Sequence, residues 1–184
     1  MRQSTLAQLA LPVSEHDHGK GLATAPVTLV EYGDYECPYS GQAYPIVKEV
    51  QRVLGDQLRF VFRNFPLAEL HPHAEGAAEA AETAGAQGKF WEMHDLLFAY
   101  QRALDLPHLL EYARQLGLDV ARFGRDLAEH RYADRVSEDV LSGARSGVKG
   151  TPTFYINGWR HNGSFDADTL VLAIRGAEGR PDRE

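Results

Sequence analysis

The residues best suited to chemistry lie in the stretch GDYECPYS, Gly33 to Ser40. Cys37 is the only cysteine among the 184 residues, and Pro38, Tyr39 and Ser40 follow it directly. A cysteine thiolate is a nucleophile that attacks disulfides. The spacing is that of a redox Cys-x-x-Cys turn with serine at the second position. The stretch therefore predicts disulfide chemistry performed by a single sulfur.

The elements on either side of Cys37 would determine its reactivity. Val27–Tyr32 is rich in β-branched residues and predicts a short buried strand. From Pro38 to Gly55, apolar residues recur at helical spacing. Cys37 would then precede a helix, where unpaired N–H groups and the positive end of the helix dipole favour a thiolate over a thiol. The alternative is a small, buried and inert cysteine.

Further along the chain, Gln57–Pro66 alternates apolar and polar residues, which predicts a strand with one more polar face. A helix-rich region follows. It begins with the alanine-rich His73–Ala86 and continues in further short helices that break at Gly117 and near His130. We expect about five helices in this region.

Strand patterning returns at Thr151–Gly158, which ends in the hairpin dipeptide Asn157-Gly158. Trp159–Asn162 is the expected partner strand. Asp166 is a candidate N-cap for a last helix that runs through Ile174.

This order predicts an α/β, thioredoxin-like fold in which a β-α-β unit and a β-β-α unit share one mixed sheet, with a helical subdomain inserted between them. The expected parts are an N-terminal tail (1–21), a first sheet part (22–67), the helical insertion (68–147), a second sheet part (148–178) and a C-terminal tail (179–184).

Composition limits the partners. The chain has 19 basic and 26 acidic residues and a net charge of −7, which argues against nucleic acid or an anionic membrane as a partner. No apolar run approaches the roughly 18 residues of a membrane span.

The first residues make a poor signal peptide, so we expect a cytoplasmic protein, although a trimmed sequence would have lost its targeting signal. A single cysteine excludes an intramolecular disulfide.

Two segments together resemble a known family. VTLVEYGDYECPYS and the downstream GVKGTPTFYING are similar to the DsbA-type branch of the thioredoxin-fold oxidoreductases, and in particular to the group with a YGDYECPYC-like signature. The resemblance runs from about Pro26 to Ile174. It implies a thioredoxin-like sheet with a helical insertion. It also implies disulfide exchange with protein or peptide substrates.

The same resemblance assigns roles to site residues. Cys37 matches the solvent-facing nucleophile, and Pro152 matches the cis-proline opposite it. The backbone of Thr151 would pair with a substrate strand, with Pro38 and Tyr39 also at the substrate site. Without the cysteine motif, Thr151-Pro152 would be interpreted as an ordinary start of a strand.

Glu31 matches an acidic residue near the buried side of the family's site. A partly buried carboxylate there could accept or relay a proton. A solvated carboxylate at the end of a strand is the alternative interpretation.

Ser40 departs from the family, which has its resolving cysteine at this position. A serine cannot release a trapped mixed disulfide, but its hydroxyl could donate a hydrogen bond to the Cys37 thiolate. We therefore expect a monothiol exchange enzyme with an external reducing thiol and no cofactor apart from glutathione as a co-substrate. The alternatives are an engineered Cys-to-Ser form of a dithiol enzyme, a non-catalytic peptide-binding module, or a glutathione-dependent transferase or isomerase.

Histidines suggest two further sites. His16-Asp17-His18 and His71-Pro72-His73 have metal-binding residue types, but no other motif completes either ligand set, so we expect no metal. His94 lies at helical spacing with Trp91 and Phe98, which predicts a packed, hydrogen-bonded histidine.

Overall fold

The computed structural model describes residues 7–179, and the chain forms two compact units. The first unit contains Met1–Gly33, Gln42–Arg63 and Leu141–Glu184. The second contains Asp34–Gly41 and Asn64–Val140.

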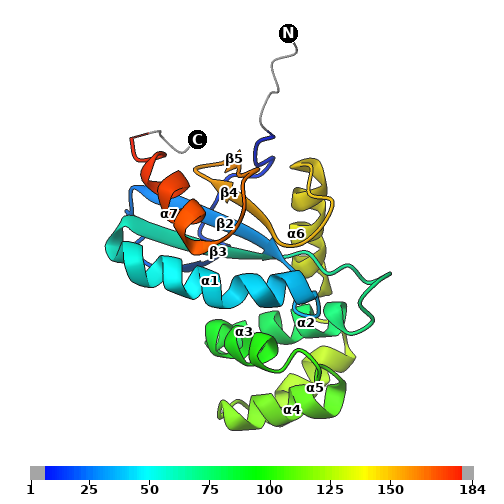
Figure 1. Ribbon diagram of the computed structural model, residues 1–184. Coiled ribbons are helices and arrows are strands. Elements are labelled where there is room, and N and C mark those ends of the chain that lie inside the picture. The colour runs from blue at the N-terminus through cyan, green and yellow to red at the C-terminus, as the bar shows by residue number, and fades with distance from the viewer. Residues whose placement is uncertain (1–6, 180–184) are drawn as a thin grey trace. The chain divides into compact units, whose positions relative to one another are not determined.

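The first unit is built on one five-stranded sheet (Figure 1). Its strands are β1 (His18–Lys20), β2 (Val27–Gly33), β3 (Leu58–Asn64), β4 (Thr153–Ile156) and β5 (Trp159–Arg160). Their spatial order is β1-β3-β2-β4-β5, and the β1–β3, β2–β4 and β4–β5 pairs are antiparallel. The β-α-β connection from β2 to β3 and the β4–β5 hairpin confirm the predicted mixed sheet.

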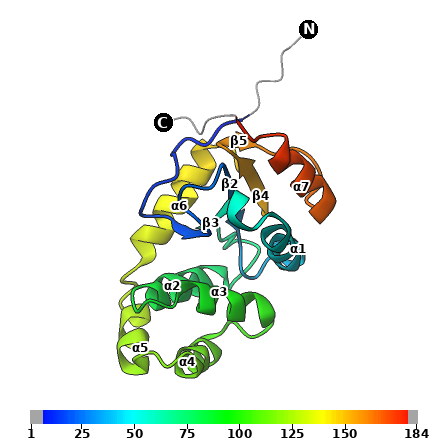
Figure 2. The ribbon, with the colours of Figure 1, turned by 90° about the vertical axis from the view of Figure 1, so that its left-hand side faces the viewer.

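Helices cover both faces of this sheet. Figure 2 shows α1 (Pro38–Leu54) and α7 (Ala167–Arg175) on one face and the C-terminal end of α6 (Ala133–Arg145) on the other. Asp166 caps α7 as predicted, because its side chain accepts a hydrogen bond from the Thr169 N–H at 2.9 Å. A short 3-10 turn, Gly55–Gln57, joins α1 to β3.

The prediction of a more polar face on the second strand is wrong. Every residue of β3 is buried except the partly exposed Arg59. The charged side chain of Arg63 is itself only 1% exposed, so alternation in the sequence does not mark a solvated face here.

The second unit is helical. It contains α2 (Ala74–Gly85), α3 (Phe90–Ala99), α4 (Leu106–Gln115), α5 (Val120–Ala128) and the first part of α6. Helix α2 packs against α3, α4 and α5, and its alanines are small enough to allow close approach. His94 is buried and bonds the Tyr35 hydroxyl through Nδ1 at 3.1 Å, as expected of a packed histidine.

The expected N-terminal tail, 1–21, is wrong where the structure describes it. The Leu9 N–H donates to Gly158 O, and the Arg160 N–H donates to Ala7 O, both at 2.9 Å. Strand β1 pairs with β3 further along this segment. Short strands and single bridges have no periodicity of their own, so their sequence resembles a tail. The C-terminal tail lies outside the described residues, except for Gly179.

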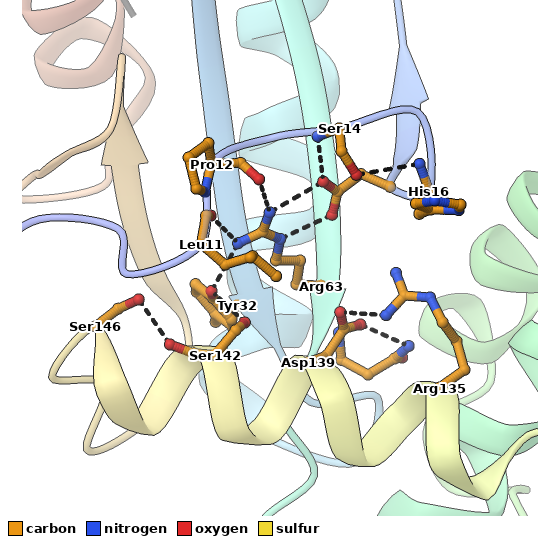
Figure 3. A network of polar contacts seen from close by, with 12 residues as sticks. Leu11, Pro12, Ser14, His16, Tyr32, Arg63, Arg135, Asp139, Ser142 and Ser146 are labelled. Carbon is orange, nitrogen blue, oxygen red and sulfur yellow. Dashed lines mark hydrogen bonds and ion pairs between the residues drawn. The ribbon is translucent and has the colours of Figure 1, made fainter. Parts of the chain in front are cut away.

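Arg63 explains why this N-terminal segment is fixed (Figure 3). Its guanidinium forms two hydrogen bonds with the Asp17 carboxylate, at 2.8 and 2.9 Å, and donates to Leu11 O, Pro12 O and the Tyr32 hydroxyl. The Asp17 side chain is 5% exposed. A buried ion pair is stable only when hydrogen bonds satisfy both partners, and these bonds provide that.

We predict that Asp17→Ala strongly destabilises the protein, because it leaves the Arg63 charge buried without its partner. The expected loss is about 3–5 kcal/mol in the free energy of unfolding, measured by urea denaturation. Arg52→Ala, which breaks the exposed Arg52–Glu49 pair, is the control and should change little. Equal losses in the two variants would contradict a structural role for Asp17.

Candidate active site around Cys37

Cys37 occupies the position immediately before α1, as the sequence predicts. Helix α1 begins at Pro38, and the Gly41 N–H donates to Cys37 O at 3.0 Å. Pro38 is exposed and Tyr39 is 62% exposed, so the two residues after the cysteine are open to a partner. The cysteine thus lies at the positive end of a 17-residue helix.

The expected solvent-facing nucleophile is not observed, because Cys37 is only 3% exposed. The turn Asp34–Cys37, here called the cysteine turn, is drawn inward by Tyr35. The Tyr35 ring packs against Phe98 with centroids 4.9 Å apart, and Gln101 donates to the carbonyls of Tyr35 and Cys37 at 2.8 and 3.0 Å. A reagent must therefore reach a recessed sulfur.

Asp34 and Gln101 are two residues that the sequence analysis missed. The Asp34 carboxylate accepts hydrogen bonds from the backbone N–H groups of Glu36 at 2.8 Å and Cys37 at 3.2 Å. The Cys37 N–H also lies 3.1 Å from Asp34 O. An Asx turn of this kind is detectable from an aspartate shortly before the start of a helix, here three residues before Cys37, so the signal for Asp34 was present in the motif.

Ser40 is fully buried one turn into α1. Its Oγ accepts a hydrogen bond from the Asp34 N–H at 3.3 Å, which leaves the hydroxyl proton available to a second acceptor. The donation from Ser40 to a Cys37 thiolate stays a prediction.

Glu31 lies on β2 in the first unit and is 2% exposed, so the solvated alternative is wrong. Its Oε1 is buried and has no hydrogen-bond partner among the described residues. Burial without a compensating charge raises the pKa of Glu31 to about 8. Gly33 leaves room for the Glu31 side chain, since a Cβ at position 33 would come within 3.1 Å of Glu31 Oε1. At neutral pH this side chain is a protonated acid.

Thr151 and Pro152 also belong to the first unit, and the peptide bond between them is cis. The register Tyr32↔Thr153 places them at the end of β2 that follows Glu31. A cavity of about 230 Å³ lies beside them and is lined by Pro152, Thr153, Phe154, Arg160, His161, Asn162, Gly163 and Phe165. The structure brings Glu31, Thr151 and Pro152 to one end of two paired strands. Docking of substrate opposite Cys37 stays a prediction.

Residues of the two histidine motifs contact charged side chains. Asp17 pairs with Arg63, and His71 and His73 each contact an acidic side chain. Within residues 7–179 no group of three or more His, Cys, Asp or Glu side chains is arranged to hold a metal ion. None of the helices in this range is long and apolar enough to cross a membrane.

A family model described as Thioredoxin matches residues 14–175. The chain belongs to the thioredoxin family. This match spans both units, including the cysteine turn and Pro152.

Among solved structures, BdbD from Bacillus subtilis in its oxidised form matches with a TM-score of 0.82 and 24% identity, over 93% of this chain and 96% of BdbD. A thioredoxin-like oxidoreductase from Silicibacter pomeroyi matches with a TM-score of 0.79 and 27% identity, over 89% of this chain and 93% of its own. Wolbachia pipientis α-DsbA1 has a TM-score of 0.79 and 20% identity, over 94% of this chain and 95% of its own. The fold is therefore thioredoxin-like and similar to DsbA-type structures.

Among curated relatives, the Na⁺/H⁺ antiporter NhaA 1 of Salinispora arenicola is 50% identical over 173 residues. The alignment covers 94% of this chain and 26% of the antiporter. The chain thus spans about a quarter of the length of this relative.

We predict that Glu31→Gln changes the pH dependence of stability. The pKa of Glu31 in the folded protein, about 8, lies above its ordinary value of 4.5, so the folded state keeps a proton that the unfolded chain releases. The free energy of unfolding should therefore fall as pH rises from about 4.5 to about 8. The glutamine variant lacks this fall and should be at least about 2 kcal/mol more stable at pH 9, measured by urea denaturation.

Glu129→Gln, at an exposed position, is the matched control and should keep the parent's pH profile. Parallel profiles for the parent protein and Glu31→Gln would show that folding does not raise the pKa of Glu31.

Proposed function

We propose that this protein is a thiol–disulfide exchange protein whose single nucleophile is Cys37. The observation that supports this most directly is the position of Cys37 before α1, on a turn fixed by Asp34, in a chain of the thioredoxin family. The helix terminus favours the thiolate. Similarity to a thioredoxin-like oxidoreductase supports the same type of chemistry.

The proposed reaction has two exchanges. The Cys37 thiolate attacks one sulfur of a substrate disulfide, forming a mixed disulfide while the other sulfur leaves as a thiolate and takes a proton. An external thiolate, with glutathione as the candidate, then attacks the substrate sulfur of the mixed disulfide, forms a new disulfide with it and releases Cys37 as a thiolate. Ser40 contributes no sulfur, and its role is hydrogen bonding to the thiolate. Electrons pass from the external thiol to the substrate.

Three residues of the first unit would assist. The Thr151 backbone and Pro152 would dock an extended substrate segment, with the adjacent cavity available to a side chain of that segment. Glu31 is protonated at neutral pH, so it could give a proton to the leaving sulfur.

We predict that alkylation of Cys37 by iodoacetamide has a pH midpoint below the roughly 8.5 of a free cysteine. Incubation with oxidised glutathione should give one adduct per chain, measured by mass spectrometry and reversed by a reducing agent. Cys37→Ala is the control and should give none. A midpoint at or above 8.5, together with no adduct, would sink the proposal and favour the peptide-binding module.

We predict that Ser40→Cys converts the protein to dithiol chemistry. The second sulfur would then attack the mixed disulfide from within the chain, so the glutathione adduct should be lost and an intramolecular disulfide should appear. Thiol titration before and after reduction measures this. A persistent glutathione adduct in Ser40→Cys would show that position 40 cannot reach Cys37.

A second candidate concerns the partner. The antiporter relative is 50% identical to this chain over a region that makes up 26% of the antiporter's own length. A segment similar to this protein is thus part of an antiporter chain, which supports a substrate at or near a cation antiporter. Mixed-disulfide trapping in membranes that contain such an antiporter should give a covalent antiporter adduct with this protein and none with Cys37→Ala. Trapping of soluble proteins alone would exclude the antiporter as the substrate.

A further inference from the structure

The His71-Pro72-His73 motif contacts the cysteine turn within the second unit. His71 Nδ1 lies 2.7 Å from Asp34 Oδ2, and His73 Nδ1 lies 3.0 Å from Glu36 Oε1. The His73 N–H also donates to Glu36 Oε2 at 2.6 Å. Two acidic residues just before Cys37 are therefore each bound by one of two histidines.

The two contacts are not equivalent. The Asp34 side chain is fully buried and His71 is 18% exposed, whereas Glu36 and His73 are 20% and 49% exposed. The first pair is shielded from solvent, where electrostatic interactions are stronger. The second pair is open to solvent and should have a weaker effect.

Asp34 connects the two sides of this arrangement. Oδ1 accepts from the N–H groups of Glu36 and Cys37, while Oδ2 accepts from the Leu67 N–H at 2.9 Å and from His71 Nδ1. A carboxylate has about four acceptor sites, so the described bonds use them all. Because a carboxylate only accepts, His71 donates its Nδ1 proton in this pair.

The two donors to Oδ2 come from one closed turn. The His71 N–H donates to Leu67 O at 2.9 Å, which brings the Leu67 N–H and the His71 ring to the same oxygen. Helix α2 starts at Ala74, three residues after His71. Asp34 thus connects the residue before α1 to the segment that leads into α2.

We propose that Asp34 and His71 form a positioning pair for Cys37, in which Asp34 fixes the cysteine turn and His71 offsets the negative charge that Asp34 places at the backbone of Cys37. Asp34 bonds the backbone N–H of Cys37 itself, and a carboxylate this close disfavours a second negative charge. The donor from His71 reduces that effect. This inference rests on the proposed function, since it concerns the reactivity of the same cysteine.

The test compares the pH midpoint of Cys37 alkylation in variants with that of the parent protein. His71→Ala should raise the midpoint by about half to one pH unit, which lowers the rate below the midpoint roughly three- to tenfold. His71→Asn, whose amide can donate from nearly the same place as Nδ1, should return the midpoint to near the parent value. Asp34→Asn removes the charge and should lower the midpoint.

The two variants should shift the alkylation midpoint in opposite directions, and this distinguishes an electrostatic role of the pair from a purely structural one. A purely structural role would move His71→Ala and Asp34→Asn in the same direction, toward a free cysteine, and that result would overturn the proposal. His73→Ala is the matched control and should shift the midpoint clearly less than His71→Ala does. Thermal unfolding by circular dichroism checks each variant; if Asp34→Asn does not fold, the contrast among the three histidine variants decides.

The same experiments test the proposed function separately from the positioning pair. A parent protein that forms no glutathione adduct, with the variant shifts as expected, would overturn disulfide exchange and leave the positioning pair intact. An adduct together with equal midpoints in all variants would overturn the positioning pair alone.

Discussion

The site depends on the solvation of one buried carboxylate. Asp34 has lost its contact with water, so its charge is stable only if protein donors replace that water. Four donors do so, two from the cysteine turn and two from the turn before α2. The position of Cys37 before α1 and the path of the chain into α2 are therefore consequences of the same requirement. Gln101 also stabilises the cysteine turn, because its side chain donates hydrogen bonds to the carbonyls of Tyr35 and Cys37.

Other buried carboxylates of this protein differ in how fully protein donors replace the lost water. Asp17 is satisfied by a full guanidinium, which fixes an otherwise patternless segment against the sheet (Figure 3). In the second unit, Asp139 accepts bonds from Asn64 and Arg135, yet burial still raises its pKa to about 6. Glu31 Oε1 has no such donor, and the pKa of Glu31 rises to about 8. Burial thus raises the pKa of both Asp139 and Glu31, and the rise is larger for Glu31, whose Oε1 has no hydrogen-bond partner in the described part of the chain.

Local patterns in the sequence predicted the elements well. The β-branched stretch became β2, the helix from Pro38 became α1, and Asp166 caps α7. These elements depend on side-chain period, capping and turn chemistry, which act within a few residues. The order of the elements was enough to predict a thioredoxin-like mixed sheet. The cysteine motif was enough to locate the candidate site.

The failures share a physical cause. Arg63 appeared to mark a polar face because its partner, Asp17, lies 46 residues away in the chain. The tail interpretation failed because a three-residue strand is defined only by its pairing with β3. Cys37 was expected in solvent because no local pattern shows that Tyr35 would pack on Phe98 and draw the turn inward.

The sequence by itself determined which residues could do chemistry, a lone thiol before a helix with a serine in place of the second sulfur. It also determined the order of strands and helices, because backbone preference and side-chain period are local properties. Only the tertiary structure decided the raised pKa of Glu31, the burial of Cys37 and the contacts of the two histidines before α2. These depend on desolvation and on hydrogen-bond donors from distant parts of the chain, which exist only once the units have folded.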